Sequence, residues 1–439
     1  MSTKFDSTYS AVVSMAEQLV GEGKYDSTYS AVLAIYQNLT SDVDTKFDSV
    51  YSIVVKIADG IESGEIDLGG GGDSGSEEQD FSPKIRFFDF DGNIVEQWTL
   101  DEAKTKTEND FPTLGSIGFG SFDLNFDGWN TPLQDMHETT SDIAVGSMWK
   151  PSDGNSWIKV NIEPENLTTV LLIEVLGDCV IDWGDGTTDD ADTISGYPQH
   201  TYASAGEKWI KIIGDWNPMW GSTESVTEKY NNYPIWYYNN QITEIYLGRD
   251  TERYSFSYLK SLQHITFPNV QHTYTNYLSY FSFAYDGLLK NLYLPYGDGN
   301  IPTASSSSGP FYRCYNLEVL SWRGWSQNVK IGERMFYRCY NLKYITIYHK
   351  VTSISTYAFS SCSSLQSINI PDGVTSIGNN AFSSCQYLTV DFSQHTQVPT
   401  LSSTSAFEST AVILVPSALY DEWISATNWS SLTSQIIAV

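Results

Sequence analysis

Four cysteines recur at nearly constant spacing in the C-terminal half of the chain, where thiols could bind a metal ion or form disulfides. They are Cys314, Cys339, Cys362 and Cys385, which are 25, 23 and 23 residues apart. The chain has no Cys-x-x-Cys pair, and the spacing of His349 and His395 does not indicate zinc. A residue that recurs once per repeat is most simply a packing position. We therefore expect buried free thiols in one interior column, and no metal or cofactor.

The segment FFDFDGN (87–93) could support phosphoryl chemistry. It resembles the start of phosphotransferases of the haloacid-dehalogenase family, and that resemblance would make Asp89 the nucleophile and Asp91 the general acid and base. Asn93 stands where the family has threonine, however, and no second half of an α/β domain follows. Asp-Gly is also the most common turn of a β-hairpin, so the pattern favours a turn over a catalytic site.

Two other acidic segments could bind cations. DLNFDGWNTPLQ (123–134) places Asp123, Asn125 and Asp127 at calcium-ligand positions, but Gln134 replaces the bidentate glutamate and no helices flank the loop. DWGDGTTDDAD gathers five carboxylates, those of Asp182, Asp185, Asp189, Asp190 and Asp192. A hairpin turn followed by a polar loop explains this second segment without an ion. The patterns favour turns and leave calcium binding open.

Composition limits the possible partners. The 439 residues carry 24 Lys and Arg against 53 Asp and Glu, and the net charge of −29 disfavours nucleic acid and membranes as partners. An apolar content of 41% is sufficient for packed cores in about two to four domains. The N-terminus lacks the uninterrupted apolar run of a secretory leader, and no segment has the roughly 18 to 20 apolar residues of a membrane span. We therefore expect synthesis and assembly in a cytoplasm.

Residues 1–62 contain three similar segments with apolar residues at helical spacing. Asp6, Asp26 and Asp48 stand at N-cap positions. Helices of about four turns are too short to be stable alone in water, so their apolar stripes must pack on each other or on another chain. The aromatic residues expected to anchor this module are Phe5, Tyr9, Tyr25, Tyr29, Phe47 and Tyr51. Residues 63–80 are a flexible Gly/Ser/acidic linker that tethers this module to the rest of the chain. The module itself could be a plain helical bundle, an anchor or a homo-oligomerisation module such as a trimer.

Residues 81–150 are expected to form strands. KIRFFDF and IVEQWTL are alternating runs joined by the turn DGN, which predicts a hairpin. IRFFDFDGNIVEQWTLDEA and FDGWN (126–130) resemble the β-grasp-like B repeats of internalin-type bacterial surface proteins. The resemblance implies a small β-grasp-like module.

Residues 151–215 have the short alternating runs of a β-sandwich. VIDWGDGT followed by HTYASAGEKWIKI resembles the polycystic-kidney-disease (PKD) type of immunoglobulin-like domain, which implies a spacer or binding module.

The next segment, 216–240, is rich in aromatic residues with polar handles, which are favoured at interfaces and on sugar rings. The candidate interaction residues are Trp216, Trp220, Tyr230, Tyr233, Trp236, Tyr237 and Tyr238. Their alternative role is to cap the open end of the region that follows.

Residues 241–439 repeat an apolar L-x-x-I/L pair at intervals of 20 to 28 residues. A unit of this length cannot bury its own apolar face and must stack on neighbours, which predicts a solenoid. VTSISTYAFSSCSSLQSINIPDGVTSIGNNAFSSC closely resembles the leucine-rich repeats of bacterial surface antigens, and AVILVPSALYDEWISATNWSSL is similar to their C-terminal cap. The fold class is therefore mainly β, with a helical module, a β-grasp-like module, a PKD-like sandwich and a leucine-rich-repeat solenoid of about seven turns.

No constellation of residues indicates catalysis, and this order of modules is typical of adhesion and display proteins. Our first hypothesis is a structural protein of a tailed-phage virion, such as a head fibre, a decoration protein or a tail-fibre component. Residues 1–62 would bind other virion proteins, and the outer modules would contact host-surface polysaccharide or protein. The apparent lack of a leader favours this hypothesis over the alternative, a cell-surface or secreted leucine-rich-repeat adhesin of a gut bacterium.

Overall fold

The computed structural model describes residues 84–439 except 140–141, 172, 176–177, 192–193, 195–196, 219–228, 231–232, 235–239, 250–255, 257–258, 270–282, 296–308 and 323–328. The chain divides into two compact units, Met1–Asp80 and Phe81–Val439. The first unit, with the expected helical module, its six aromatic anchor candidates and the linker, lies outside the described residues. Among the described residues, no helix is long and apolar enough to cross a bilayer.

The second unit begins with a five-stranded mixed sheet. Its strands are β1 (Lys84–Phe88), β2 (Ile94–Thr99), β3 (Ile117–Gly118), β4 (Asp123–Trp129) and β5 (Ile143–Pro151), in the order β2-β1-β5-β4-β3. The hairpin of β1 and β2 is confirmed, with Ile85 opposite Trp98, whereas β1 and β5 run parallel. Because side chains alternate across a strand, this sheet has two apolar faces to cover.

Two short helices cover one face of this sheet. They are α4 (Leu100–Ala103) and α5 (Leu133–Glu138), and a 3-10 turn, η1 (Glu108–Asp110), lies between them in the chain. Thr99 and Glu102 form a reciprocal capping box that starts α4. Phe87 of β1 packs at ring-centroid distances of 4.5 Å from Trp98 and 5.1 Å from Trp129 in the core beneath them.

A second sheet continues directly into the C-terminal region. It contains β6 (Ser156–Ile162), β9 (Val180–Asp182), β10 (Thr188–Asp190), β12 (Gly206–Ile213), β16 (Ile242–Tyr246) and β17 (His264–Thr266), in the order β10-β9-β12-β6-β16-β17. β6 pairs antiparallel with β16, with Ile158 opposite Ile245, and β16 pairs parallel with β17. The first coil of the C-terminal region is therefore closed by a strand of the preceding β region, so its edge is not left unpaired.

Three two-stranded pairs accompany this sheet. They are β7 (Thr168–Val170) with β11 (Gln199–Thr201), β8 (Ile173–Val175) with β13 (Trp216–Pro218), and β14 (Lys229–Tyr230) with β15 (Tyr233–Pro234). Val170, Ile173 and Trp216 join Ile158 and Ile210 of the six-stranded sheet in one buried cluster. Residues of the first two pairs thus pack with that sheet around a shared core.

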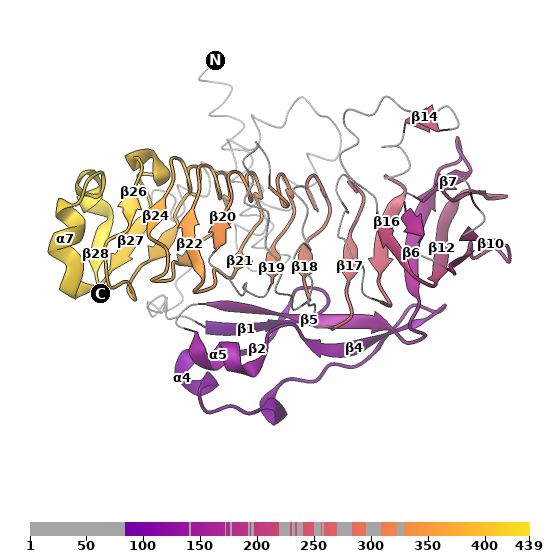
Figure 1. Ribbon diagram of the computed structural model, residues 1–439, viewed down its shortest axis with the longest axis horizontal. Helices are drawn as coiled ribbons and strands as arrows, with labels where there is room; N and C mark the ends of the chain where they lie inside the picture. The colour runs from indigo at the N-terminus through magenta and orange to yellow at the C-terminus, as the bar shows by residue number, and fades with distance from the viewer. Residues whose placement is uncertain are drawn as a thin grey trace, which may run out of the picture. The chain divides into compact units, whose positions relative to one another are not determined.

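The C-terminal region is a solenoid of about seven turns, as the repeat predicts. One face continues from β16 and β17 through β18 (Asn291–Tyr293), β19 (Val319–Ser321), β21 (Tyr344–Ile345), β23 (Ser367–Asn369), β25 (Thr389–Asp391), β27 (Val412–Val415) and β28 (Ile436–Ala438). A second face consists of β20 (Val329–Ile331), β22 (Val351–Ile354), β24 (Ser376–Ile377) and β26 (Thr400–Leu401). Paired strands of neighbouring coils run parallel on both faces (Figure 1), and on the first face the pairing is interrupted between β17 and β18 and between β21 and β23.

Two columns of side chains fill the solenoid. One is a continuous phenylalanine stack with centroid distances of 4.9 to 6.0 Å, formed by Phe256, Phe283, Phe311, Phe336, Phe359, Phe382 and Phe407. The other is the predicted cysteine column, in which every thiol is free and buried. Each Sγ donates to the carbonyl of a phenylalanine one coil upstream, as from Cys339 to Phe311 O at 3.2 Å and from Cys385 to Phe359 O at 3.1 Å. The prediction of buried free thiols is confirmed.

The last coil is covered by a short helical cap. It contains η3 (Thr404–Ala406), η4 (Ser417–Leu419), α7 (Tyr420–Ser425) and η5 (Trp429–Gln435), and ends in β28. Trp423 and Trp429 are fully buried and lie 4.6 Å apart by ring centroids. Trp429 Nε1 also donates to Pro399 O at 2.7 Å. These indoles close the apolar end of the stack.

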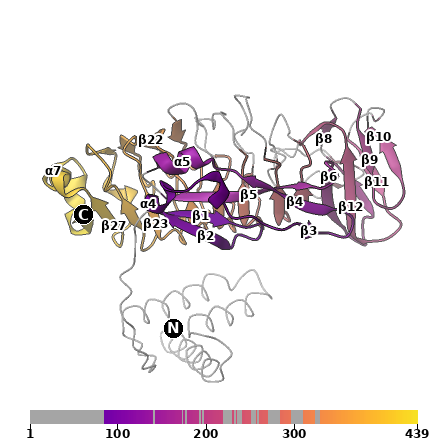
Figure 2. The same ribbon diagram turned by 90° about the horizontal axis from the view of Figure 1, so that it is seen from below.

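Strand β5 lies across the strand face of the solenoid (Figures 1 and 2). Along β5, Ala144 N donates to Thr346 Oγ1 at 2.8 Å, Gly146 N donates to Ser321 Oγ at 3.1 Å, and Trp149 N donates to Phe267 O at 3.2 Å. Successive residues of one strand thus contact successively earlier coils. The strand face from β17 to β21 is covered by the five-stranded sheet, so along these coils it cannot be an open recognition face.

Candidate functional site

Of the aromatic residues predicted as an interaction surface, Trp216 is the one whose side chain lies within the described structure. Trp216 lies in β13 and is buried, which corrects its assignment to a surface: its indole packs in the core of the sheet region. Tyr230 and Tyr233 lie opposite each other in the pair of β14 and β15. The remaining candidates, Trp220, Trp236, Tyr237 and Tyr238, lie outside the described residues. Strand β6, not this segment alone, covers the start of the solenoid.

The carboxylate of Asp89 closes a turn. Asp89 Oδ1 accepts from the backbone N–H of Asp91 at 3.0 Å and of Asn93 at 2.8 Å, and Asn93 Nδ2 donates to Oδ2 at 3.1 Å. Asn93 departs from the phosphotransferase pattern, and its backbone and side-chain N–H groups close the hairpin turn by donating to Asp89. A nucleophilic carboxylate must be free to attack, so the geometry agrees with the turn.

The calcium-like segment forms a strand. Asp123–Trp129 is β4, in which alternate side chains point to opposite faces, so the pattern of a ligand loop is not realised. Asp127 pairs with Lys150 and accepts from the backbone N–H of Asn269 at 2.8 Å. Gln134 lies in α5, where its amide donates to Glu138 at 2.9 Å. The carboxylate of Asp127 thus links the five-stranded sheet to the solenoid at Asn269.

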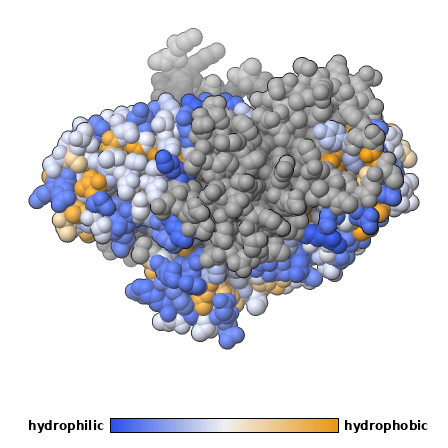
Figure 3. Space-filling view, in the orientation of Figure 1, coloured by the Kyte–Doolittle hydropathy of each residue, from blue (hydrophilic) through white to orange (hydrophobic). Residues whose placement is uncertain are grey.

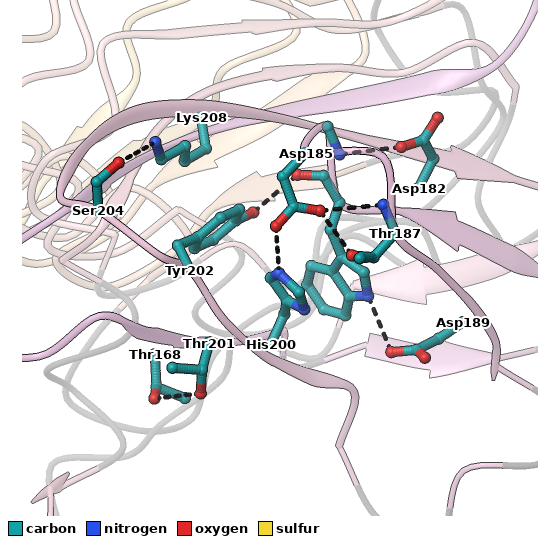
Figure 4. Close-up of polar contacts among 12 residues, drawn as sticks. Thr168, Asp182, Asp185, Thr187, Asp189, His200, Thr201, Tyr202, Ser204 and Lys208 are labelled. Carbon is teal, nitrogen blue, oxygen red and sulfur yellow. Dashed lines mark hydrogen bonds and ion pairs between the residues drawn. The ribbon is translucent and has the colours of Figure 1, made fainter.

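The DWGDGT turn is locked by its neighbours (Figure 4). Asp185 accepts from the hydroxyl of Thr187 at 2.6 Å and lies 2.8 Å from His200 Nε2. The bonds from Thr187 and His200 lower the pKa of Asp185 to about 2. The His200 ring stacks on Trp183 at 5.0 Å, and Tyr202 donates its hydroxyl proton to Trp183 O at 3.0 Å. A His–Asp pair could orient a nucleophile, but here both partners are engaged in fixing the turn.

Within the described part of the chain, no group of three His, Cys, Asp or Glu side chains is arranged to hold a metal ion. The two cavities described there are small, about 10 and 20 Å³ in volume. Both are lined by residues of the five-stranded sheet and of the solenoid, where these pack together. Neither of these cavities has room for more than a water molecule, so a candidate functional site lies on the surface.

A surface of tyrosine and arginine lies on the turns that join the second solenoid face to the first. We call it the Tyr–Arg surface; it consists of Tyr285, Tyr312, Arg313, Tyr315, Arg334, Tyr337, Arg338, Tyr340 and Tyr357. Two successive coils supply most of it, through the repeated sequence FYRCYN at 311–316 and 336–341. The phenylalanine and the cysteine of this motif recur in the later coils, as Phe359 and Cys362 do. Its other residues are the signal that could have identified the surface.

Equivalent tyrosines of neighbouring coils stack in register. Tyr312 and Tyr337 have ring centroids 5.5 Å apart with planes inclined by 14°, and Tyr315 and Tyr340 have centroids 5.6 Å apart with planes inclined by 11°. Tyr285 extends the first row toward the N-terminal coils at 5.5 Å from Tyr312. The stacking follows from the solenoid, because equivalent positions repeat at nearly the spacing of neighbouring strands.

The guanidinium groups lie over these rings. Arg313 Cζ is 5.6 Å from the ring centroid of Tyr285 and 5.1 Å from that of Tyr312, and Arg338 Cζ is 5.2 Å from that of Tyr337. Such cation–π contacts hold the side chain without neutralising its charge. In the described part of the chain, no carboxylate pairs with Arg313 or Arg338, although acidic residues outnumber basic ones by more than two to one.

The fold does not require arginine or tyrosine at these positions. Arg313 and Arg338 have left-handed backbone conformations, with φ of 61° and 63°, and Ser361 and Ser384 have the same conformation at the equivalent positions of later coils. Arg313 N donates to Tyr337 O at 2.9 Å, just as Ser361 N donates to Ser383 O at 2.7 Å. Serine therefore fits the same turn with the same backbone bonds. The Tyr and Arg side chains must be explained by something other than packing of the coil.

The comparisons with known proteins concern the solenoid. Residues 234–321 and 304–415 match the model of the BspA-type leucine-rich repeat region, in six copies. Residues 234–415 are a BspA-type leucine-rich repeat region. The predicted leucine-rich-repeat solenoid is thereby confirmed, and the five-stranded and six-stranded sheets precede the BspA-type repeats or continue into them.

A solved structure is also similar to this chain. A leucine-rich repeat protein from Bacteroides ovatus aligns over 41% of this chain and 61% of its own, with 19% identity and a TM-score of 0.23. The aligned part is thus less than two thirds of that protein, and the similarity is too low to support a conclusion about function. No curated protein matches the chain.

Proposed function

We propose that this chain is a non-enzymatic, adhesion-type binding protein whose BspA-type solenoid presents the Tyr–Arg surface to a partner. The proposal is supported by a difference in side chains between coils whose turns have the same backbone conformation. FYRCYN stands in two neighbouring coils, where later coils have FSSCSS and FSSCQY. A change from serine to tyrosine and arginine that the turn does not need is best explained by binding, because these two residues are enriched at binding hot spots.

The β region serves this function as a rigid support. We propose a β-grasp-like module at 81–150 and a PKD-like sandwich at 151–215. The pairing of β6 with β16 and the bonds from β5 to three coils fix both to the solenoid. Rigid placement of a surface lowers the entropy lost on binding. Residues 1–62 are proposed as an anchor or oligomerisation module.

We place the protein at a bacterial cell surface. The BspA-type match supports the adhesin hypothesis, whereas no comparison supports a role in a phage virion. Protease treatment of intact producing cells tests this placement: a surface protein is cleaved while a cytoplasmic control protein remains whole. Protection of this chain until the cells are lysed would argue against display.

Binding itself is tested with the purified full chain on mucin-coated plates and on epithelial cells. We expect saturable binding that is lost when Tyr312, Arg313, Tyr337 and Arg338 are all replaced by serine, the residue found at the equivalent positions of later coils. Lack of saturable binding to both surfaces, or hydrolysis of mucin glycans by the purified chain, would contradict the proposed function.

A further inference from the structure

The geometry of the Tyr–Arg surface points to an acidic polysaccharide as its ligand. We infer that a carboxylate-bearing, repeating glycan lies along the solenoid axis, with its carboxylates on Arg313 and Arg338 and its hydroxyl groups on the tyrosine edges. This inference rests on the proposed function and names the class of ligand. The chemistry, the spacing and the charge of the described residues each support it.

Among the described residues no carboxylate pairs with Arg313 or Arg338, so their guanidinium groups are suited to an anion. Arginine presents a planar fork of N–H donors that matches a carboxylate with two parallel hydrogen bonds. Arg313 and Arg338 occupy equivalent positions in adjacent coils, and each guanidinium lies over a tyrosine ring at 5.1 to 5.2 Å. Contact with a ring restricts a flexible side chain without neutralising its charge, and because Nε of Arg313 is buried, a ligand would approach the terminal nitrogens of that guanidinium. Two such groups in register are suited to two anionic groups on one extended molecule.

The tyrosine rows specify hydroxyl-rich partners. Stacked rings use their faces on one another and leave hydroxyl-bearing edges for a ligand. Among the described residues, no group accepts from or donates to the hydroxyls of Tyr315, Tyr337 or Tyr340, and Tyr340 is 39% exposed. A phenol can both donate and accept, as sugar hydroxyls do. Asn316 and Asn341, joined by a 3.1 Å hydrogen bond, add amide groups beside the second row.

The repeat favours a polymer over a folded protein partner. Both rows advance by about one coil per ring, 5.5 to 5.6 Å. A ligand with the same chemical group at regular intervals can satisfy successive coils in the same way, whereas the surface of a folded protein that is not built of repeats has no such period. The surface therefore fits a linear chain of similar units.

The charge of the molecule argues against nucleic acid. Double-stranded DNA carries one negative charge per about 1.7 Å of its axis, and the net charge of −29 disfavours its approach. A polyuronate has a lower charge density than DNA and offers hydroxyl groups that phosphate backbones lack. Local attraction by two guanidinium groups is then sufficient for binding.

The test measures binding of the full chain to polygalacturonate by titration calorimetry, with dextran as a neutral glucan and single-stranded oligo-dT as a polyanion without sugar carboxylates. We expect binding to polygalacturonate that weakens as salt rises, and none to dextran. The variant Arg313→Ser/Arg338→Ser should lose at least about tenfold in affinity, since charged hydrogen bonds contribute strongly. Tyr312→Ser/Tyr337→Ser should also bind more weakly.

A matched control removes two cationic charges elsewhere. Lys104 and Arg249 are exposed and paired with Asp101 and Asp215, so Lys104→Ser/Arg249→Ser should keep the affinity for polygalacturonate. Thermal unfolding of all variants checks that the coils remain folded. Equal loss in the control and in Arg313→Ser/Arg338→Ser would show a non-specific charge effect and overturn the inference.

Other outcomes separate the ligand class from the function. If the full chain binds mucin or epithelial cells but not polygalacturonate, the inference is wrong and the proposed function stands. If it binds oligo-dT more tightly than polygalacturonate, the surface is a nucleic-acid site instead. If the full chain binds polygalacturonate through Arg313 and Arg338 but binds neither mucin nor epithelial cells, the inferred ligand class is confirmed and the proposed adhesion to host surfaces is wrong.

Discussion

Asn130 and Ser321 are 191 residues apart in the chain, and Asn130 Nδ2 lies 2.9 Å from Ser321 Oγ in a buried seam. Asn130 follows β4, and Ser321 ends β19 of the solenoid. Gly146 N of β5 donates to Asn130 Oδ1 at 2.9 Å and to Ser321 Oγ at 3.1 Å, which closes the network. Buried polar groups must be satisfied, so this seam fixes one alignment of sheet and solenoid.

The close approach at Gly146 is the first target for mutation. A Cβ at this position would collide with the ring of Tyr293 in β18, so Gly146→Ala must push the sheet away from the solenoid. We expect a loss of about 1–3 kcal/mol in the free energy of unfolding. Urea unfolding followed by tryptophan fluorescence measures it, and a second transition would appear if the sheet separates first.

Gly115→Ala is the matched control, because nothing lies within 4 Å of the Cβ that it would add. Its stability should stay within about 0.5 kcal/mol of the unmodified chain. If Gly146→Ala is equally harmless, the sheet is not held against the solenoid in solution.

Periodicity explains what the sequence could predict. The recurrence of cysteine and of the L-x-x-I/L pair is imposed by stacking, so the solenoid, its buried thiols and the β1–β2 hairpin can be predicted from local patterns. The pairing of β6 with β16 and the crossing of β5 over several coils join segments about 80 to 200 residues apart. No local pattern encodes such contacts, and the sequence therefore suggested separate modules.

The candidate site shows the same limit. Tryptophan is a residue type that is common at interfaces, yet the indole of Trp216 is buried in the core. Tyr312 and Arg313 directly precede Cys314, and the regular recurrence of this cysteine is the more conspicuous pattern in the sequence. The contrast of FYRCYN with FSSCSS is visible in the sequence, whereas the stacking of the rings and the shared turn conformation are properties of the fold.

The second prediction concerns Asp286, which occupies the cysteine column one coil before Cys314. It is fully buried, Oδ1 accepts from Leu259 N at 3.0 Å, and Oδ2 has no partner in the described structure. Burial raises the pKa of the Asp286 carboxyl well above its ordinary value. The folded state thus prefers the neutral acid. Its contribution to stability is complete below the pKa of the unfolded chain and is lost as pH rises toward the folded pKa.

Asp286→Asn keeps the shape and the acceptor and removes the titration. We expect the variant to match the unmodified chain near pH 4 and to exceed it at pH 8 by about 1–3 kcal/mol, the usual penalty of a poorly solvated polar group. Urea unfolding at a series of pH values measures the difference. Asp178→Asn, at an exposed position, should show no such divergence. Parallel pH curves for the unmodified chain and Asp286→Asn would refute the prediction.

The third prediction concerns the reactivity of the thiols. All five cysteines are buried, and burial raises the pKa of the Cys339 thiol to about 12. Because the thiolate is the reactive form, the native chain should react with Ellman's reagent only on the time scale of unfolding. The same chain in urea should release colour for five thiols at once. Rapid reaction of more than one thiol in the native chain would show that the column is open, because only Cys179 lies outside it.

The last prediction tests the closure of the solenoid by β6. A chain beginning at residue 241 would expose the edge of β16 along the register that now pairs Ile245 with Ile158 and Tyr246 with Trp157. An unpaired edge beside an apolar stack is a template for association, so we expect oligomers or precipitate in light scattering after size exclusion. A chain beginning at residue 81 retains the whole second compact unit and should lack this edge-driven association. If the shorter chain is a stable monomer, the solenoid closes without β6, and the preceding sheets would serve only to support the Tyr–Arg surface.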